Sequence, residues 1–161
     1  MSNAQYLASL VNSSGNINIP VSNAGINFNN SSAIGASTLT DYETGSWTPT
    51  DASGAGLTFT SVYASYVKIG KTVTVTYTFN YPTTVNTAST SISGLPFTSA
   101  NNYPCVNVLF NNSTSVNMVA YTPTPGNLIY FYTSPSGFIH VTNAALSGIQ
   151  IIGSLTYLAT A

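Results

Sequence analysis

The stretch Thr72-Val-Thr-Val-Thr-Tyr-Thr-Phe-Asn-Tyr81 alternates strictly between polar and apolar side chains. Its even-numbered positions carry threonine or asparagine, and its odd-numbered positions carry valine or an aromatic residue. A period of two, in β-branched and aromatic residues, predicts a half-buried β-strand over 72–81. One face is expected to be aliphatic and aromatic, and the other to be a threonine ladder.

Other predicted strands lie before and after this segment in the chain. Turn residues at Pro123–Gly126 and at Pro135–Gly137 indicate two hairpins. Short strands at this spacing predict an all-β domain over 41–161, an antiparallel β-sandwich or jelly roll. The further strands are expected at 57–67, 87–93, 105–110, 115–121, 127–133, 137–142 and 147–158.

The first forty residues have a different character. Apolar residues spaced by three and four predict a short helix at about 3–11, which needs a partner surface because it is short. Residues 12–40 are rich in Asn, Ser and Gly and lack enough apolar residues for a core. We therefore expect residues 1–40 to form an attachment arm, extended after the helix, that becomes ordered on another surface.

Charge is nearly absent from the chain. Only 3% of the residues are charged, against about 25% in an average domain, and the formal net charge is −1. This excludes an electrostatic footprint for nucleic acid or an anionic membrane, and no apolar run approaches a membrane span of about 18 residues. A surface of neutral polar groups favours association. We expect a subunit of an assembly, with a homotrimer covering the exposed sheet edges.

The carboxylates are the first candidates for chemistry. Asp41 and Glu43 would share a face of an extended segment, at a spacing that roughly suits a glycosidase pair. The run 41–46 instead favours a capped turn, in which Asp41 accepts hydrogen bonds from nearby backbone amides. Asp51 is the third carboxylate, and a threefold axis could bring together three copies of Asp51 or of His140 as metal ligands.

The remaining reactive side chains do not favour catalysis. His140 alternates with Ile139 and Val141 in a predicted strand, which suggests a structural or interface histidine. The single cysteine, Cys105, suggests a small buried residue. Nucleophile and phosphate-loop motifs are absent, and too few ligands exist for a zinc site in one subunit. We therefore expect no enzyme activity, no cofactor and no metal.

The aromatic residues leave two interpretations open. Flat rings beside amide groups could form a sugar-binding platform, or the same rings could fill the core or a subunit interface. Tyr130 and Tyr132 alternate with Ile129 and Phe131, so one of these two sets must face the core. The aromatic residues in question are Trp47, Tyr121, Tyr130, Phe131, Tyr132 and Phe138.

Three segments of the chain, in order, resemble motifs of tailed-bacteriophage virion proteins. The first, Leu39-Thr-Asp-Tyr-Glu-Thr-Gly-Ser-Trp-Thr-Pro49, resembles a segment that joins an attachment region to a β-rich domain. The second, Tyr66-Val-Lys-Ile-Gly-Lys-Thr-Val73, resembles the segment that opens the next strand. The third, Ile92-Ser-Gly-Leu-Pro-Phe97, resembles the segment that follows it.

The resemblance implies a non-enzymatic, commonly trimeric component of the virion. Because the arm is short, the resemblance favours a capsid cement or decoration protein, or a short head fibre, on the outside of the particle. The alternative is the receptor-binding part of a tail fibre or spike, which would contact host-surface glycans.

In the leading interpretation the arm docks on the major capsid protein or another virion protein. Apolar arm residues would make the contact: Tyr6, Leu7, Leu10, Val11, Ile17, Ile19, Ile26 and Phe28. The junction between arm and domain, or between subunits, would use Asp41, Tyr42, Glu43, Trp47, Lys68 and Lys71, the lysines as ion-pair partners of the acids.

Overall fold

The computed structural model divides the chain into two units, Met1–Tyr42 and Glu43–Ala161, each of which is described by itself. In the first unit, β1 (Ile26–Asn27) pairs with β2 (Thr38–Leu39) in antiparallel fashion. The residues that the structure describes are 26–27, 38–39, 41–100, 109–111, 118–123, 125–133 and 139–160.

Most of the predicted arm lies outside these residues. The helix predicted at about 3–11 falls there, and the docking role of the arm stays a prediction. Only the backbone pairing of Ile26 with Leu39 is described among the apolar arm positions. The arm residues outside the described ranges are Tyr6, Leu7, Leu10, Val11, Ile17, Ile19 and Phe28.

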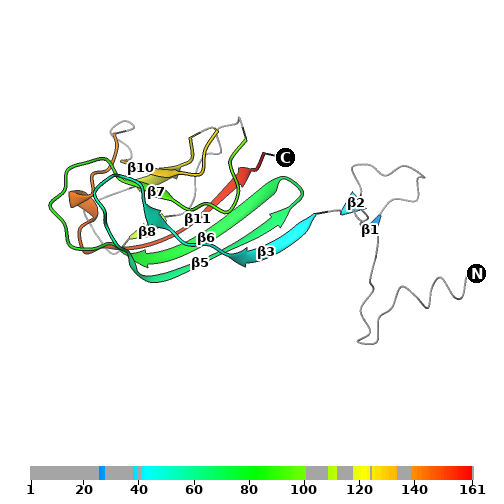
Figure 1. Cartoon of the computed structure of the whole chain (residues 1–161), viewed down its shortest axis with the longest axis horizontal. Coiled ribbons are helices and arrows are strands. Elements are labelled where there is room, and N and C mark those ends of the chain that lie inside the picture. Colours follow the sequence, from blue (N-terminus) through cyan, green and yellow to red (C-terminus); the bar gives the residue numbers. More distant parts are fainter. Residues whose placement is uncertain are drawn as a thin grey trace, which may run out of the picture. The chain divides into compact units, whose positions relative to one another are not determined.

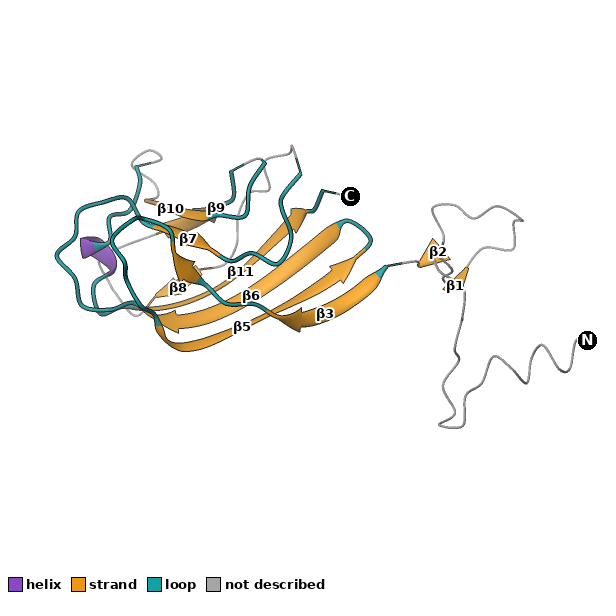
Figure 2. Cartoon of the chain, in the orientation of Figure 1, coloured by secondary structure: helices purple, strands orange, loops and turns teal. Residues whose placement is uncertain are grey.

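The second unit is an antiparallel β-sandwich, as predicted (Figures 1 and 2). One sheet has the order β3-β5-β6-β11-β8, and the other has the order β4-β7-β10-β9. The five-stranded sheet contains β3 (Tyr42–Ser46), β5 (Thr60–Ile69), β6 (Thr72–Asn80), β11 (Gln150–Leu158) and β8 (Leu109–Asn111). The four-stranded sheet contains β4 (Thr50–Asp51), β7 (Ser91–Ser93), β10 (Ile129–Thr133) and β9 (Met118–Tyr121).

Strand β6 is the centre of the larger sheet. It pairs along its whole length with β11, from Thr72 opposite Leu158 to Asn80 opposite Gln150. Its other edge pairs with β5. The side chains of Val73, Val75 and Phe79 are almost fully buried, whereas the threonines between them face outward. The prediction of a two-faced strand is therefore confirmed.

The core lies between the two sheets. From β11, Ile151, Leu155 and Tyr157 point inward beside the apolar face of β6, and they meet Ile129 and Phe131 of β10. All five side chains are at most 2% exposed. Burying one such side chain contributes roughly 1.5–3 kcal/mol. The structure thus places Ile129 and Phe131 inward, which leaves Tyr130 and Tyr132 on the outer face.

Several predicted strands differ in extent from the observed ones: 87–93 is observed as Ser91–Ser93, and 127–133 as Ile129–Thr133. The strand predicted at 57–67 is observed as Thr60–Ile69, with a β-bulge between Thr60 and Tyr63. Ser61 occupies the bulge with a φ of 51°, and such bulges break the strict alternation of a strand. The strand predicted at 147–158 begins at Gln150, because the 3₁₀ turn Ala144–Leu146 and Gly148, with a φ of 71°, precede it.

The strand predicted at 137–142 is not continuous in its described part. His140 and Thr142 form isolated antiparallel bridges, to Tyr132 and Ser89 respectively. The two bridges join different neighbours, so residues 139–142 cross from one partner to another instead of extending one ladder. His140 is therefore not the strand residue that its sequence context suggested.

The turn predicted at 41–46 is wrong as well. Tyr42–Ser46 forms strand β3, at the edge of the five-stranded sheet beside β5. The aspartate-capped turn occurs instead at Asp51, whose Oδ1 accepts from the backbone N–H of Ser53 at 3.0 Å and from its hydroxyl at 2.6 Å. Its Oδ2 accepts from the backbone N–H of Leu57 at 3.0 Å. The expected kind of turn thus occurs, but a different aspartate caps it.

A buried polar network continues from this turn. Asn143 is fully buried, and its Oδ1 accepts a 2.6 Å hydrogen bond from the Tyr81 hydroxyl. Its amide nitrogen donates to Ser53 Oγ at 2.9 Å and to Asn86 Oδ1 at 2.8 Å. Burial raises the pKa of Tyr81 to about 12. The network joins the segments that contain Ser53, Asn86 and Asn143, and it satisfies the buried amide.

Candidate functional site

The three motifs that carry the phage resemblance meet at one place in the second unit. Strand β3 lies in the first motif and neighbours β5, which contains the start of the second. Strand β4 follows the first motif and pairs with β7 of the third, with Thr50 opposite Ser93. We call the motif residues whose contacts are described below the motif cluster: Glu43, Gly45, Trp47, Thr48, Tyr66, Lys68, Gly94 and Phe97.

Tyr66 links all three motifs. Its hydroxyl donates to Glu43 Oε1 at 2.5 Å, and its ring packs edge-on against Phe97 with centroids 5.4 Å apart. The ring also lies against Gly45, where an added Cβ would be 2.7 Å from the nearest ring carbon. Hydrogen bonding to Glu43 raises the pKa of Tyr66. Glycine at position 45 is therefore what allows the tyrosine to reach the carboxylate.

Lys68 extends from the same edge of β5. Its Nζ lies 5.3 Å from the centroid of the Phe97 ring, which is within the range of a cation–π contact. Lys71, just beyond β5, is exposed. The expected ion pairs of these lysines with Asp41 and Glu43 remain a prediction.

Gly94 is the closest contact between the first and third motifs. Its φ is +99°, and an added Cβ would lie 2.1 Å from the backbone oxygen of Thr48. Beside it, Trp47 is 7% exposed, and its indole N–H donates to the backbone oxygen of Thr76 at 3.3 Å. Trp47 packs edge-on against Tyr77, so it belongs to the core and not to a sugar platform.

Sequence reasoning found part of this cluster. It selected Glu43, Trp47 and Lys68. Glu43 and Lys68 are linked through the Tyr66–Phe97 ring pair, whereas the indole of Trp47 contacts β6. Asp41 is half-buried and Tyr42 is 63% exposed. Five other contributors were missed as site residues, although they stand within the quoted motifs: Gly45, Thr48, Tyr66, Gly94 and Phe97.

The carboxylates of the second unit act here as hydrogen-bond acceptors. Glu43 accepts from Tyr66, and Asp51 accepts from Ser53 and Leu57. Partial burial acts to raise the pKa of Asp51, but the hydrogen bonds outweigh it, and the pKa lies below its ordinary value. Among the residues that the structure describes, no group of three or more His, Cys, Asp or Glu side chains is placed to hold a metal.

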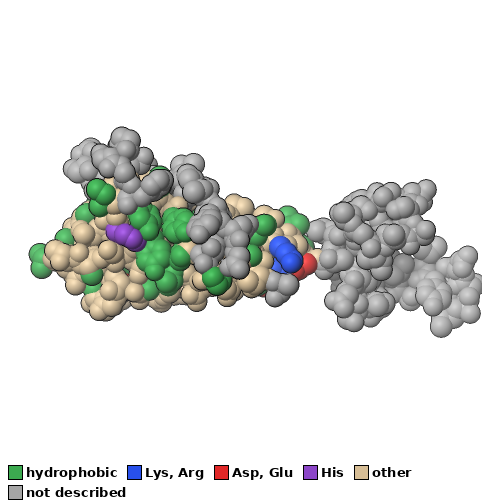
Figure 3. Space-filling view, turned by 90° about the horizontal axis from the view of Figure 1, so that it is seen from above, with side chains coloured by type: hydrophobic (Ala, Val, Ile, Leu, Met, Phe, Trp, Pro, Cys, Tyr) green, Lys and Arg blue, Asp and Glu red, His purple; other side chains and the backbone are tan. Residues whose placement is uncertain are grey.

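A second surface feature is the tyrosine–histidine patch, formed by Tyr121, Tyr130, Tyr132 and His140 on the four-stranded sheet. Tyr132 and His140 have ring centroids 4.2 Å apart, and a 3.0 Å hydrogen bond joins Tyr132 Oη to His140 Nε2. Tyr130 packs edge-on against His140, and Tyr121 against Tyr132. Figure 3 shows the histidine among hydrophobic side chains on this face. Phe138 and Cys105 lie outside the described residues.

Comparison of the chain with protein-family models, with curated proteins and with solved structures found no match. In the described part of the chain, no helix has the length and apolarity needed to cross a membrane. A functional proposal therefore depends on the motifs and on their geometry.

The Gly94–Thr48 contact gives a first prediction. Gly94→Ala should lower the free energy of unfolding by more than about 3 kcal/mol, because the new Cβ collides with backbone and cannot rotate away. Gly148→Ala is the matched control: its φ is +71°, but no atom lies within 4 Å of the new Cβ. It should cost only about 1–2 kcal/mol. Urea denaturation followed by Trp47 fluorescence measures both, and equal losses would contradict the contact.

Asp51 gives a prediction on acid stability. Its pKa is lowered in the folded state, so its contribution is present above the unfolded pKa of about 3.9 and is lost as the pH falls through the folded value. The stability of the wild type should therefore drop between about pH 5 and pH 2 by more than that of Asp51→Asn. Urea midpoints across this range test the difference. Parallel pH profiles would show that the Asp51 hydrogen bonds do not stabilise the fold.

Proposed function

We propose that this chain is a non-enzymatic structural protein of a tailed-phage virion. In this proposal it is a capsid cement or decoration protein, or a short head fibre, on the outside of the particle. Residues 1–40 dock on the major capsid protein, and the β-sandwich, of jelly-roll type, forms a homotrimer. Asp41, Tyr42 and the motif cluster form the junction between the arm and the domain.

One observation carries this proposal. Three short segments resemble phage virion motifs, and they contact one another although they lie far apart in the chain. The contacts are the Tyr66–Glu43 hydrogen bond, the Tyr66–Phe97 ring pair and the close approach of Gly94 to Thr48. The three motifs therefore behave as one structural unit.

The motif cluster includes residues at the start of the domain, where a docked arm would transmit force. Residues 1–40 continue directly into β3, so any pull on the arm reaches the domain through this strand. Glu43 ties β3 to Tyr66 of β5, and the backbone N–H of Trp47 donates to the oxygen of Ala64 at 3.2 Å. The buried indole of Trp47 adds a bond to β6. Three hydrogen bonds thus attach the start of the domain to β5 and β6.

Docking would bury the apolar side chains of the arm against the shell. Each such side chain contributes on the order of 1.5–3 kcal/mol when fully buried, before the cost of ordering the chain. Three arms on one trimer act together and raise the apparent affinity without a new contact. The near absence of charge suits this role, because a surface covered by neighbours needs no charge to stay soluble.

The tyrosine–histidine patch favours one alternative, the receptor-binding part of a tail fibre or spike. Tyr130 and Tyr132 present partly exposed rings beside the exposed His140. Rings of this kind offer an apolar face together with a polar group at the edge, which is the chemistry that a host glycan would need. In that case the domain, and not the arm, would make the functional contact.

Deletion of residues 2–38 separates these two proposals. The shortened chain should fold and stay oligomeric, yet fail to bind phage particles that lack the protein, because the docking surface is gone. Co-sedimentation of the wild-type and shortened chains with such particles measures the loss. Decoration of the shell at full occupancy by the shortened chain would refute the docking arm. Its binding to host cells, with few copies per virion, would favour the receptor-binding alternative.

A further inference from the structure

The outer face of the five-stranded sheet is a regular array without charge. Strands β5, β6 and β11 place their outward side chains in four rows, which follow from the pairing register. The rows are Tyr63–Thr78–Ile152, Ser65–Thr76–Ser154, Val67–Thr74–Thr156 and Ile69–Thr72–Leu158. We call this array the hydroxyl face.

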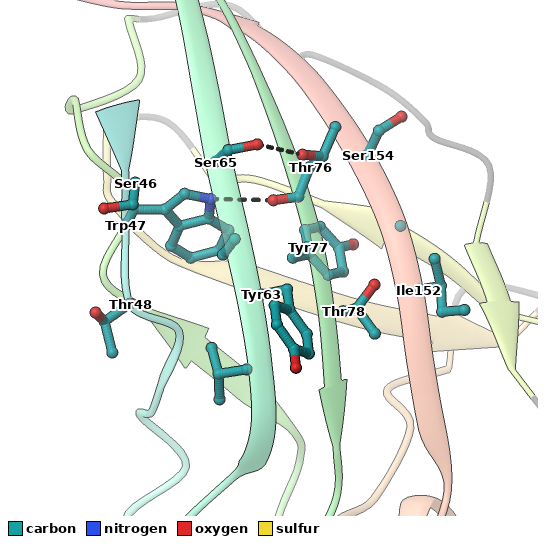
Figure 4. A pocket seen from close by; sticks show the side chains of 13 residues that line it. Ser46, Trp47, Thr48, Tyr63, Ser65, Thr76, Tyr77, Thr78, Ile152 and Ser154 are labelled. Atoms are coloured by element: carbon teal, nitrogen blue, oxygen red, sulfur yellow. Dashed lines mark hydrogen bonds between the residues drawn. The ribbon is translucent and has the colours of Figure 1, made fainter. Parts of the chain in front are cut away.

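Apolar side chains stand on both flanks of this face. On β5, Tyr63 is 75% exposed and Ile69 is 51% exposed. On β11, Ile152 is 38% exposed and Leu158 is 41% exposed. The central column on β6 is threonine throughout. At one end the face is hollowed into an open depression of about 900 Å³, lined by Tyr63, Thr76 and Ile152 among others (Figure 4).

From this pattern we propose that the hydroxyl face is where copies of this chain contact one another. The inference rests on the proposed homotrimer and identifies its interface. In such a trimer the three faces surround the axis with β6 nearest to it. The β5 flank of one copy then meets the β11 flank of the next, and apolar side chains cover apolar side chains.

Charge is the first reason to choose a copy of the chain as the partner. None of the twelve side chains in the array is charged. Lys68 belongs to β5 but lies over Phe97, with alternation placing it on the opposite side from Val67 and Ile69. A nucleic acid or a charged protein would find no complementary charge here. A second copy of the chain presents the same uncharged face, so the contact involves neither electrostatic attraction nor electrostatic repulsion.

The hydroxyl groups are the second reason. A threonine or serine hydroxyl donates one hydrogen bond and accepts two, so a column of them can pair with an identical column. Within one chain Ser65 bonds Thr76 at 2.8 Å, and Thr74 bonds Thr156 at 3.0 Å. Each of these groups keeps acceptor capacity for a hydroxyl from another copy. In a threefold arrangement the three β6 columns meet around the axis, where hydroxyls of one copy can donate to hydroxyls of the next.

The array alone is smaller than a stable interface between two subunits. Rows about 6.8 Å apart on strands about 4.8 Å apart cover roughly 300–400 Å². A stable interface buries about 800 Å² on each partner. Neighbouring surfaces must therefore supply the rest, while the hydroxyl face supplies the part most remote from solvent. A charge introduced there has no water to solvate it and no partner.

Thr76→Lys tests the inference, because Thr76 lies in the middle of the central column and its side chain is exposed in the single chain. The wild-type chain should be a trimer by light scattering coupled to size exclusion, and Thr76→Lys should be a folded monomer at the same concentration. Thr87→Lys is the matched control: Thr87 is exposed but lies outside the array, so this variant should remain a trimer. Circular dichroism melting confirms that each variant is folded.

Tyr63→Asp provides a second variant if Thr76→Lys does not fold, since its 75% exposed side chain lies outside the core cluster. It should dissociate the oligomer in the same way. A trimer that survives either folded variant would overturn the interface while leaving the proposed function standing. A wild-type monomer at all concentrations would overturn both the interface and the proposed homotrimer. Failure of an intact wild-type trimer to bind particles would instead count against the proposed function.

Discussion

The alternation of strand β6 is the constraint on which the rest of the domain depends. Its odd-numbered side chains fill the space between the sheets, and its even-numbered side chains form an outer column of threonines. Because a shift of one residue would exchange these two faces, the register with β5 and β11 is strongly determined. The same pairing that buries Val75 and Phe79 therefore creates the uncharged face outside.

Around this sheet, two glycines allow aromatic side chains to cross neighbouring strands. Tyr77 lies over Gly153 and Tyr66 over Gly45, in each case closer to the glycine than a side chain at that position would permit. Tyr66 thereby reaches both Glu43 and Phe97, and it connects the segments that resemble phage motifs. The phage resemblance and the packing of the sheet edge thus concern the same residues.

The sequence predicted the fold class and β6 well, because strict alternation over ten residues fits a half-buried strand and does not fit a helix. It predicted less where a single residue changes the local geometry: the bulge at Ser61 breaks the alternation within β5, and the turn at Gly148 delays the start of β11. Asp41 and Asp51 stand in similar polar contexts, but the structure has a strand after Asp41 and a capped turn after Asp51. The contacts of Gly94 with Thr48 and of Asn143 with Tyr81 join residues far apart in the chain, which a local pattern cannot reveal.

A trimeric domain anchored on the outside of a phage shell is the central claim of this account. Reconstruction, by electron cryo-microscopy, of the phage particle that carries this chain tests that claim most directly. We predict threefold density on the shell exterior, with the β6 threonine column nearest the axis and the start of β3 directed toward the capsid. The claim would be contradicted if the chain were absent from the particle or if its copies met through the tyrosine–histidine patch.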